Sequence, residues 1–241
     1  MNAIECAALG KRYRRGWALR DCTLSIPAGH VVALVGPNGA GKTTLLNLAV
    51  GLATATTGAV TVLDGTPAGS PDALDRIAFV AQDAPLYKNL PTADMLHVAR
   101  NLNRRWDDQR AQARLDELGI PRQKKVGQLS GGQKAQLALT IALARRPDLL
   151  VLDEPLAALD PLARHEFMRS LMATVAADGI SVVLSSHVVA ELERVASYLI
   201  VLSFGQVTVA GNVGDLVAAH GGGLEEIVLA SMRDSGKEVP A

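Results

Sequence analysis

Hydrophobic and polar residues follow two patterns along the chain, which predict two kinds of strand. Apolar and polar positions alternate over residues 4–9 and 19–26, as expected for antiparallel strands with one buried face. Four later runs are continuously apolar, as in strands of a parallel sheet buried on both faces: Val31 to Val35, Leu149 to Leu152, Ile180 to Leu184 and Leu199 to Leu202. Helical patterns separate these runs, so the sequence predicts a doubly wound α/β core.

The second half of the pattern predicts an insertion and an appended helix. Amphipathic helical periodicity, bounded by prolines, indicates a helical subdomain at about residues 83–145 within a domain of residues 1–220. The glycines at 221–223 are expected to connect this domain to a short C-terminal helix and tail, residues 224–241, whose Ile227, Val228 and Leu229 should pack against the core. A natural loop and an engineered bridge remain alternatives for the three glycines.

Composition narrows the class of protein. The 241 residues carry zero formal net charge, which argues against a dedicated nucleic-acid binder. No apolar run reaches the length of a membrane span, and the N-terminus lacks the pattern of a secretory signal, so we expect a cytoplasmic location. Cys6 and Cys22 lack metal-site spacing and are expected to be buried free thiols.

A glycine-rich loop follows the first buried run and precedes a helix expected from Lys42 to about Val50. It consists of Gly36, Pro37, Asn38, Gly39, Ala40, Gly41, Lys42, Thr43 and Thr44. Glycines let backbone amides point at phosphate oxygens, and the helix N-terminus adds its positive dipole end. Lys42 is expected at the β- and γ-phosphates and Thr43 at Mg²⁺, which prefers oxygen ligands. The alternative is a glycine turn beside an ordinary surface lysine.

Two carboxylates, Asp153 and Glu154, come directly after the second buried run. Open α/β sheets bind ligands at the carboxyl ends of their strands, so this position favours a functional role. We expect Asp153 to hold magnesium and Glu154 to polarise the attacking water, a contribution of about 10²- to 10⁴-fold for a general base. A solvated helix cap fits less well, because Pro155 follows the pair.

The signature segment, Leu129 to Gln133, completes the pattern. Ser130 suits the N-cap of a helix expected over residues 133–144, and Gly131 and Gly132 leave backbone amides uncovered for an anion. These motifs in this order resemble the nucleotide-binding subunits of ATP-binding-cassette (ABC) transporters over about residues 5–220. The resemblance implies a phosphate-loop NTPase core with a mixed, mainly parallel sheet, an antiparallel β subdomain and an inserted helical subdomain.

The resemblance also implies further site residues. Ser130 to Gln133 would complete the ATP site of the opposite subunit in a head-to-tail dimer. Gln82 matches the glutamine that senses magnesium and water, Asp160 the loop that crosses the interface, and His187 the switch histidine at the γ-phosphate. Each also has an ordinary interpretation, as a surface glutamine, a helix N-cap and a structural histidine. Tyr13 stands at the position that stacks on adenine, with Trp17 as the rival.

The predicted function is that of an ATP-hydrolysing subunit, with ATP and Mg²⁺ as cofactors, that powers a membrane transporter of bacterial exporter type. Its partners would be transmembrane permease subunits in separate chains and a second ABC ATPase subunit, identical or different, at the inner face of the membrane. Permease docking is expected near Leu86 and Tyr87, apolar residues that follow Gln82. A soluble ABC ATPase acting on DNA, ribosomes or protein assemblies is the alternative, and a phosphate-loop kinase ranks far behind.

Overall fold

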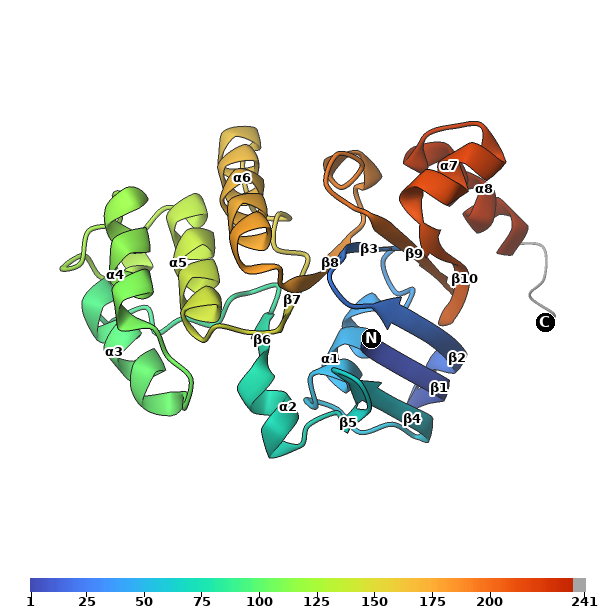
Figure 1. The fold of residues 1–241 in the computed structure, drawn as a ribbon, viewed down its shortest axis with the longest axis horizontal. Helices are drawn as coiled ribbons and strands as arrows, with labels where there is room; N and C mark the ends of the chain where they lie inside the picture. The colour runs from blue at the N-terminus through green and yellow to red at the C-terminus, as the bar shows by residue number, and fades with distance from the viewer. Residues whose placement is uncertain (236–241) are drawn as a thin grey trace. The chain divides into compact units, whose positions relative to one another are not determined.

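A computed structural model describes residues 1–235, and the chain divides into two compact units (Figure 1). The first unit combines Met1–Leu74 with the segment that begins at Ser181, and the second is Asp75–Ile180. A short helix, α2 (Pro71–Arg76), lies at the boundary. No helix in the described residues has the length and apolar character needed to cross a membrane.

The first unit contains an antiparallel sheet with the strand order β2-β1-β4-β5. Its strands are β1 (Asn2–Tyr13), β2 (Gly16–Pro27), β4 (Thr57–Val62) and β5 (Thr66–Pro67). The antiparallel pairing expected of β1 and β2 is confirmed, with Ile4 opposite Ile26, but register shifts such as the one between Cys6 and Leu9 interrupt the alternation of buried and exposed residues. Both strands run past the expected bounds, because Tyr13 still pairs with Gly16 across the turn.

The same unit contains strands in the order β10-β9-β3-β8: β3 (Val31–Val35), β8 (Ser181–Ser186), β9 (Tyr198–Ser203) and β10 (Gln206–Asn212). β3 pairs parallel with both β8 and β9, and β10 pairs antiparallel with β9. Every residue of β3 and β8 is buried, as continuous apolar runs predict. The other elements of this unit are α1 (Lys42–Ala49), the 3₁₀ helix η2 (Val189–Glu191), α7 (Val213–His220) and α8 (Leu224–Ser235).

Helix α8 corrects one prediction. Ile227 and Val228 are each 2% exposed, but Leu229 is 46% exposed. The packing expected for Leu229 is therefore wrong. The buried face of α8 is formed by Leu224, Ile227 and Val228, at the i, i+3, i+4 spacing of one helix face, and Leu229 lies outside it.

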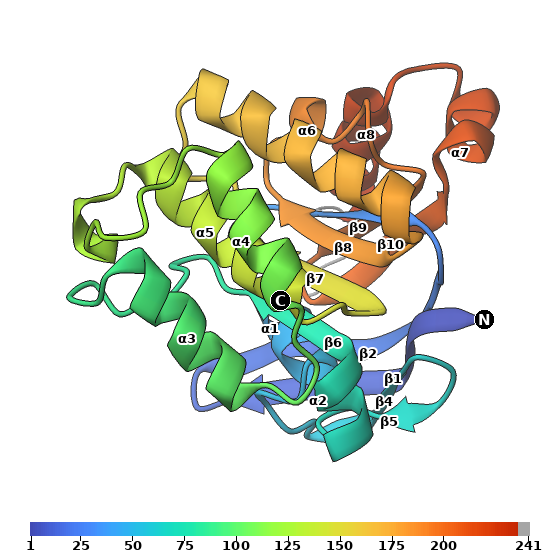
Figure 2. The ribbon, with the colours of Figure 1, turned by 60° about the vertical axis from the view of Figure 1, so that its left-hand side comes forward.

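The second unit contains two parallel strands, β6 (Ile77–Val80) and β7 (Leu149–Asp153). Its helices are α3 (Thr92–Leu102), α4 (Asp108–Glu117), η1 (Val126–Gln128), α5 (Gly131–Ala144) and α6 (Pro161–Asp178). Figure 2 shows α3, α4 and α5 grouped together, and buried side chains from them share one apolar cluster that includes Leu96, Leu115 and Leu137. The helical part of this unit thus has a core of its own.

Both cysteines are buried and free, as expected. Burial raises the pKa of the Cys6 thiol to about 12 and also raises the pKa of Cys22. The thiolate is the reactive form of cysteine, so these side chains behave as small apolar residues.

Candidate functional site

The glycine-rich loop of the first unit connects β3 to α1. A Cβ on Gly36 would lie 2.3 Å from the Leu202 carbonyl oxygen, and one on Gly41 would lie 2.6 Å from the Ala18 carbonyl oxygen. Gly41 also has a left-handed backbone with φ of 105° and is the N-cap of α1. The loop backbone therefore packs directly against neighbouring strands, and larger residues at these two glycines would displace it.

Lys42 folds back over this loop. It is 6% exposed, and its Nζ donates to the Gly36 carbonyl oxygen at 2.7 Å and to that of Pro37 at 3.4 Å. The ammonium group is thereby held beside the backbone amides of a helix start, which attract anions. Thr43, the next residue, is exposed at the same helix start. This part of the chain combines a fixed cation, a hydroxyl and a positive helix end.

His187 leaves the sheet at the same edge as the loop. β3 and β8 are parallel neighbours in which Val35 pairs with Ser186. Gly36 and His187 are therefore the first residues beyond a matched pair of strand ends, and His187 is exposed. Within the first unit, the structure brings the candidate switch histidine and the glycine-rich loop together at one edge of the sheet.

Tyr13 and Trp17 lie close to each other on the β1–β2 hairpin, where Arg12 pairs with Trp17. Tyr13 is 49% exposed, and the Lys11 Nζ lies 5.2 Å from the centre of its ring. The Trp17 ring covers Gly10, since a Cβ there would lie 3.0 Å from a ring carbon. The contacts of Trp17 suit a residue that covers the sheet, which leaves Tyr13 as the better candidate for adenine stacking.

In the second unit, the carboxylates and Gln82 come off adjacent strands. β6 and β7 are parallel, with Val80 paired to Leu152, so Gln82 and Glu154 each lie two residues beyond that pair. Asp153 is 2% exposed and Glu154 is 8% exposed, whereas Gln82 is exposed. The register thus places an amide and two carboxyl groups at one edge of this strand pair.

Glu154 has an unusual backbone conformation. Its φ is 47°, in the left-handed region, which costs an L-residue about 1–3 kcal/mol. The Glu154 carbonyl oxygen accepts a hydrogen bond from the Ala157 amide at 3.2 Å, so the chain turns immediately after the strand. Side chains alternate between the two faces of a strand only as far as Asp153, where β7 ends. Asp153 and Glu154 are therefore not required to point to opposite faces of the sheet. Strain of this kind is typical of functional positions.

The signature segment begins α5 through a capping box. Ser130 Oγ accepts a hydrogen bond from the Gln133 amide, and Gln133 Oε1 accepts one from the Ser130 amide, both at 3.2 Å. The N-cap prediction for Ser130 is confirmed, but the helix starts at Gly131 rather than at residue 133. Both glycines therefore lie in the first turn, where amides lack intrahelical partners.

Asp160 lies in the loop that precedes α6 and caps that helix. Its Oδ1 accepts hydrogen bonds from the amides of Leu162 and Ala163, both at 3.0 Å, which confirms the N-cap interpretation. A Cβ on Gly132 would lie 2.9 Å from the Ala163 Cβ. A Cβ on Gly131 would lie 3.6 Å from the Ala158 carbonyl oxygen, so the signature segment lies beside both the first turn of α6 and the candidate interface loop.

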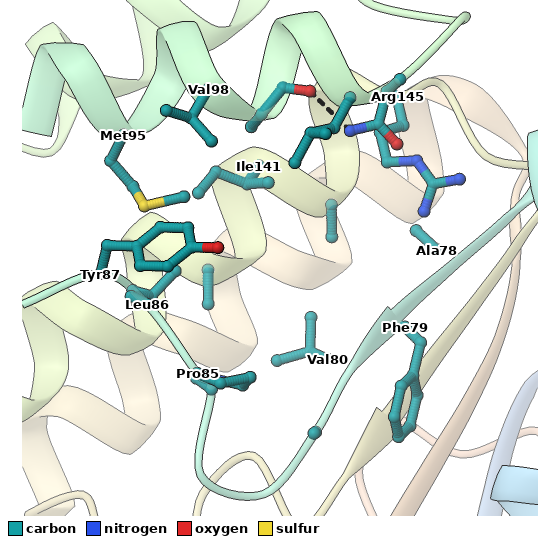
Figure 3. A pocket seen from close by; sticks show the side chains of 17 residues that line it. Ala78, Phe79, Val80, Pro85, Leu86, Tyr87, Met95, Val98, Ile141 and Arg145 are labelled. Atoms are coloured by element: carbon teal, nitrogen blue, oxygen red, sulfur yellow. Dashed lines mark hydrogen bonds between the residues drawn. The ribbon is translucent and has the colours of Figure 1, made fainter. Parts of the chain in front are cut away.

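An apolar groove of about 340 Å³ in the second unit extends what the sequence indicated (Figure 3). Figure 3 shows Met95, Tyr87 and Ile141 gathered close together, with Arg145 beside Ala78. Tyr87 is 61% exposed, and Arg145 is the charged residue of the lining. Burial lowers the pKa of the Arg145 guanidinium. The sequence indicated Tyr87 as part of this surface, but it did not indicate that α3 and α5 line the groove. The helical periodicity of these two segments was the available signal.

This chain is similar in sequence to ATP-binding proteins of ABC transporters and similar in structure to ABC transporter cassettes. A family model described as "ABC transporter" matches residues 19–157, and one described as "AAA domain, putative AbiEii toxin, Type IV TA system" matches residues 124–193. The lantibiotic transport ATP-binding protein SrtF of Streptococcus pyogenes is 32% identical over 198 residues, which cover 81% of this chain and 85% of that protein. The phosphonates import ATP-binding protein PhnC of Thiobacillus denitrificans is 33% identical, with 90% of each covered.

Among solved structures, the chain is similar to MJ0796, described as a bacterial ABC transporter cassette in dimeric form. The identity is 28% and the TM-score 0.76, and the match covers 87% of this chain and 98% of that one. The same cassette was also solved in a post-hydrolysis state bound to ADP and Pi. These likenesses extend over both compact units.

Proposed function

The chain belongs to the ATP-binding subunits of ABC transporters and is an ATPase, and we propose that it hydrolyses Mg-ATP at two composite sites in a head-to-tail dimer. The observation that carries the ATP site of this proposal is the buried Lys42 ammonium, held over the glycine-rich loop by the Gly36 carbonyl oxygen. A cation fixed beside the amides of a first helical turn, which lack intrahelical partners, is an arrangement for binding phosphate. In this proposal residues 1–220 form the ATPase domain, 221–223 the linker and 224–235 the C-terminal helix; the tail expected at residues 236–241 lies outside the described residues.

Lys42 binds the β- and γ-phosphates in this proposal, and Tyr13 stacks on the adenine. The hydroxyl of Thr43, the amide oxygen of Gln82 and the carboxylate of Asp153 are hard oxygen donors of the kind that Mg²⁺ prefers. Bound magnesium would neutralise charge on the phosphates during transfer.

Glu154 orients and polarises the attacking water, and His187 contacts the γ-phosphate. The near-complete burial of Glu154 suits this role, because a carboxylate shielded from bulk water acts on a single held water molecule. Ser130 to Gln133 contact the ATP held by the opposite subunit, while the Asp160 loop crosses the interface. The second subunit is a copy of this chain or a related ABC ATPase.

Two substitutions test the ATP site. Lys42→Ala is expected to abolish ATP binding, measured by fluorescence of a nucleotide analogue, with Lys88→Ala as an exposed lysine control. Glu154→Gln should retain binding and trap an ATP-bound dimer in gel filtration, with the exposed Glu117→Gln as its control. Unchanged ATP affinity in Lys42→Ala would refute the phosphate site. A Glu154→Gln variant that binds ATP but stays monomeric would refute the composite site.

The apolar groove is proposed as the docking site for transmembrane permease subunits, with the protein at the inner face of the membrane and transport in the export direction. Leu102 is 76% exposed and Tyr87 is 61% exposed at this groove, so two large apolar side chains are available for contact with a partner. The similarity to SrtF, a lantibiotic transport ATP-binding protein, supports a transporter of antibiotic or peptide type.

Docking is tested in inside-out membrane vesicles that contain the permease together with this subunit. Leu86→Asp and Tyr87→Asp should lower substrate accumulation while basal ATP hydrolysis of the isolated subunit persists, because they alter the groove and not the ATP site. Leu52→Asp is the control, since Leu52 is 69% exposed in the first unit. Normal transport by the groove variants would place docking elsewhere, and ATP-driven loss of substrate from these vesicles would contradict export.

A further inference from the structure

The segment that follows His187 is short and is fixed at both ends. At its start, the Val188 amide donates to Ser186 Oγ at 2.9 Å. The chain then forms η2 and reaches Leu192, which is 1% exposed and is the C-cap of η2. The exposed His187 side chain lies at the start of this segment.

Helix α8 lies against this segment although it is distant in sequence. It contacts η2, and it also contacts β9, β10 and α7 within the first unit. The side chains that seat it, Leu224, Ile227 and Val228, are each at most 2% exposed. Because β9 pairs with β3, the strand that leads into the glycine-rich loop, α8 is anchored on the sheet that carries the phosphate-binding loop.

A single carboxylate joins the two elements. Glu193 Oε1 accepts a hydrogen bond from the Leu224 amide at 3.1 Å, at the start of α8, where backbone amides lack intrahelical partners. A Cβ on Gly223 would lie 2.8 Å from the same Oε1, so glycine at that position permits the close approach. Glu193 is six residues beyond His187 and acts as a helix cap for α8 from outside that helix.

We propose that Glu193 is a positioning residue for His187. By capping α8, Glu193 holds residues 188–192 against the sheet and so keeps the His187 imidazole in place for hydrolysis. The proposal rests on the role of His187 proposed above. ATP binding at the glycine-rich loop does not use this link, so its loss should affect turnover and leave ATP binding unchanged. The C-terminal helix thereby becomes a determinant of the rate of hydrolysis.

The test compares steady-state ATP hydrolysis by three variants of the full chain. Glu193→Ala should lower kcat by at least about threefold and up to about 100-fold, the cost of misplacing a catalytic group by about 1 Å, with KM for ATP unchanged. Glu193→Gln keeps an oxygen that accepts the Leu224 amide and should restore most of kcat. Glu225→Ala removes an exposed glutamate from the first turn of the same helix and should match wild type.

A double-mutant cycle tests the route through His187. In a His187→Ala background, Glu193→Ala should have almost no further effect on the residual rate, because the group that it positions is gone. An unchanged kcat in Glu193→Ala would overturn the proposal, as would an equal loss in Glu225→Ala or an undiminished effect in the His187→Ala background. An inactive wild-type protein would instead refute the ATPase function itself, so the two failures are distinguishable.

Discussion

Gln136 on α5 is expected to destabilise the second unit. The residue is 7% exposed, and among the described residues neither its side-chain Nε2 nor its Oε1 has a hydrogen-bond partner. Its main-chain oxygen accepts from Thr140 Oγ1 at 2.8 Å, a bond that does not involve the amide group. Replacing Gln136 with Met removes the buried amide while keeping an unbranched side chain of similar length.

The expected gain follows from the cost of an unsatisfied buried polar group. Leaving such a group without a partner costs about 1–3 kcal/mol, so Gln136→Met should raise the free energy of unfolding by an amount in that range. For a chain of this length, each kcal/mol corresponds to a rise in Tm of about 2–4 °C. Met and Gln have similar helix propensities, so propensity adds little to the change.

Calorimetry would measure the change in Tm, and urea titration the change in the free energy of unfolding. Gln109→Met on the exposed side of α4 is the matched control and should stay within about 0.5 kcal/mol of wild type. Destabilisation by Gln136→Met would refute the reasoning, because it would mean that the buried amide has hydrogen-bond partners, such as buried water, in the folded protein.

Three further predictions follow from local geometry. Gly132→Ala should lower Tm, because the new Cβ would lie 2.9 Å from the Ala163 Cβ. Gly131→Ala should leave Tm nearly unchanged, because its nearest atom would be 3.6 Å away, but it should lower ATP-dependent dimerisation in gel filtration. Ile227→Asp should lower the unfolding free energy by about 1–3 kcal/mol or more in urea titration, while exposed Leu229→Asp should change it by less than about 0.5 kcal/mol. With the pKa of Cys6 raised to about 12, this thiol is protonated at pH 8 and should react with a disulfide reagent only after unfolding; rapid reaction in the native protein would contradict its burial.

Local chemistry made much of the fold predictable. Continuous apolar runs indicated buried parallel strands, and the loop before Lys42 indicated the start of α1, which the structure has at that residue. Capping rules identified Ser130 and Asp160 as N-caps. The start of α5 was placed two residues too late, because glycine is a poor helix former and the capping box outweighs this preference.

Features that depend on contacts between distant segments were not predictable. The hydrogen bond from the Leu224 amide to Glu193 joins residues 31 positions apart, and neither sequence position signals the other. The close contact of Gly132 with Ala163 likewise requires α5 and α6 to be placed first. The positive φ of Glu154 also has no sequence signal, since glycine is the residue expected in the left-handed region. The roles of the site residues stay predictions until the variants are measured.

The capping role of Ser130 is compatible with the role proposed for it at a phosphate. A serine hydroxyl has one hydrogen to donate and two lone pairs that accept. In the capping box Ser130 Oγ accepts from the Gln133 amide, and that bond uses a lone pair rather than the hydroxyl hydrogen. Phosphate oxygens are acceptors and require the donor. The cap therefore fixes the position of the oxygen while its hydrogen can turn toward a phosphate, so helix capping and anion binding do not compete at this residue.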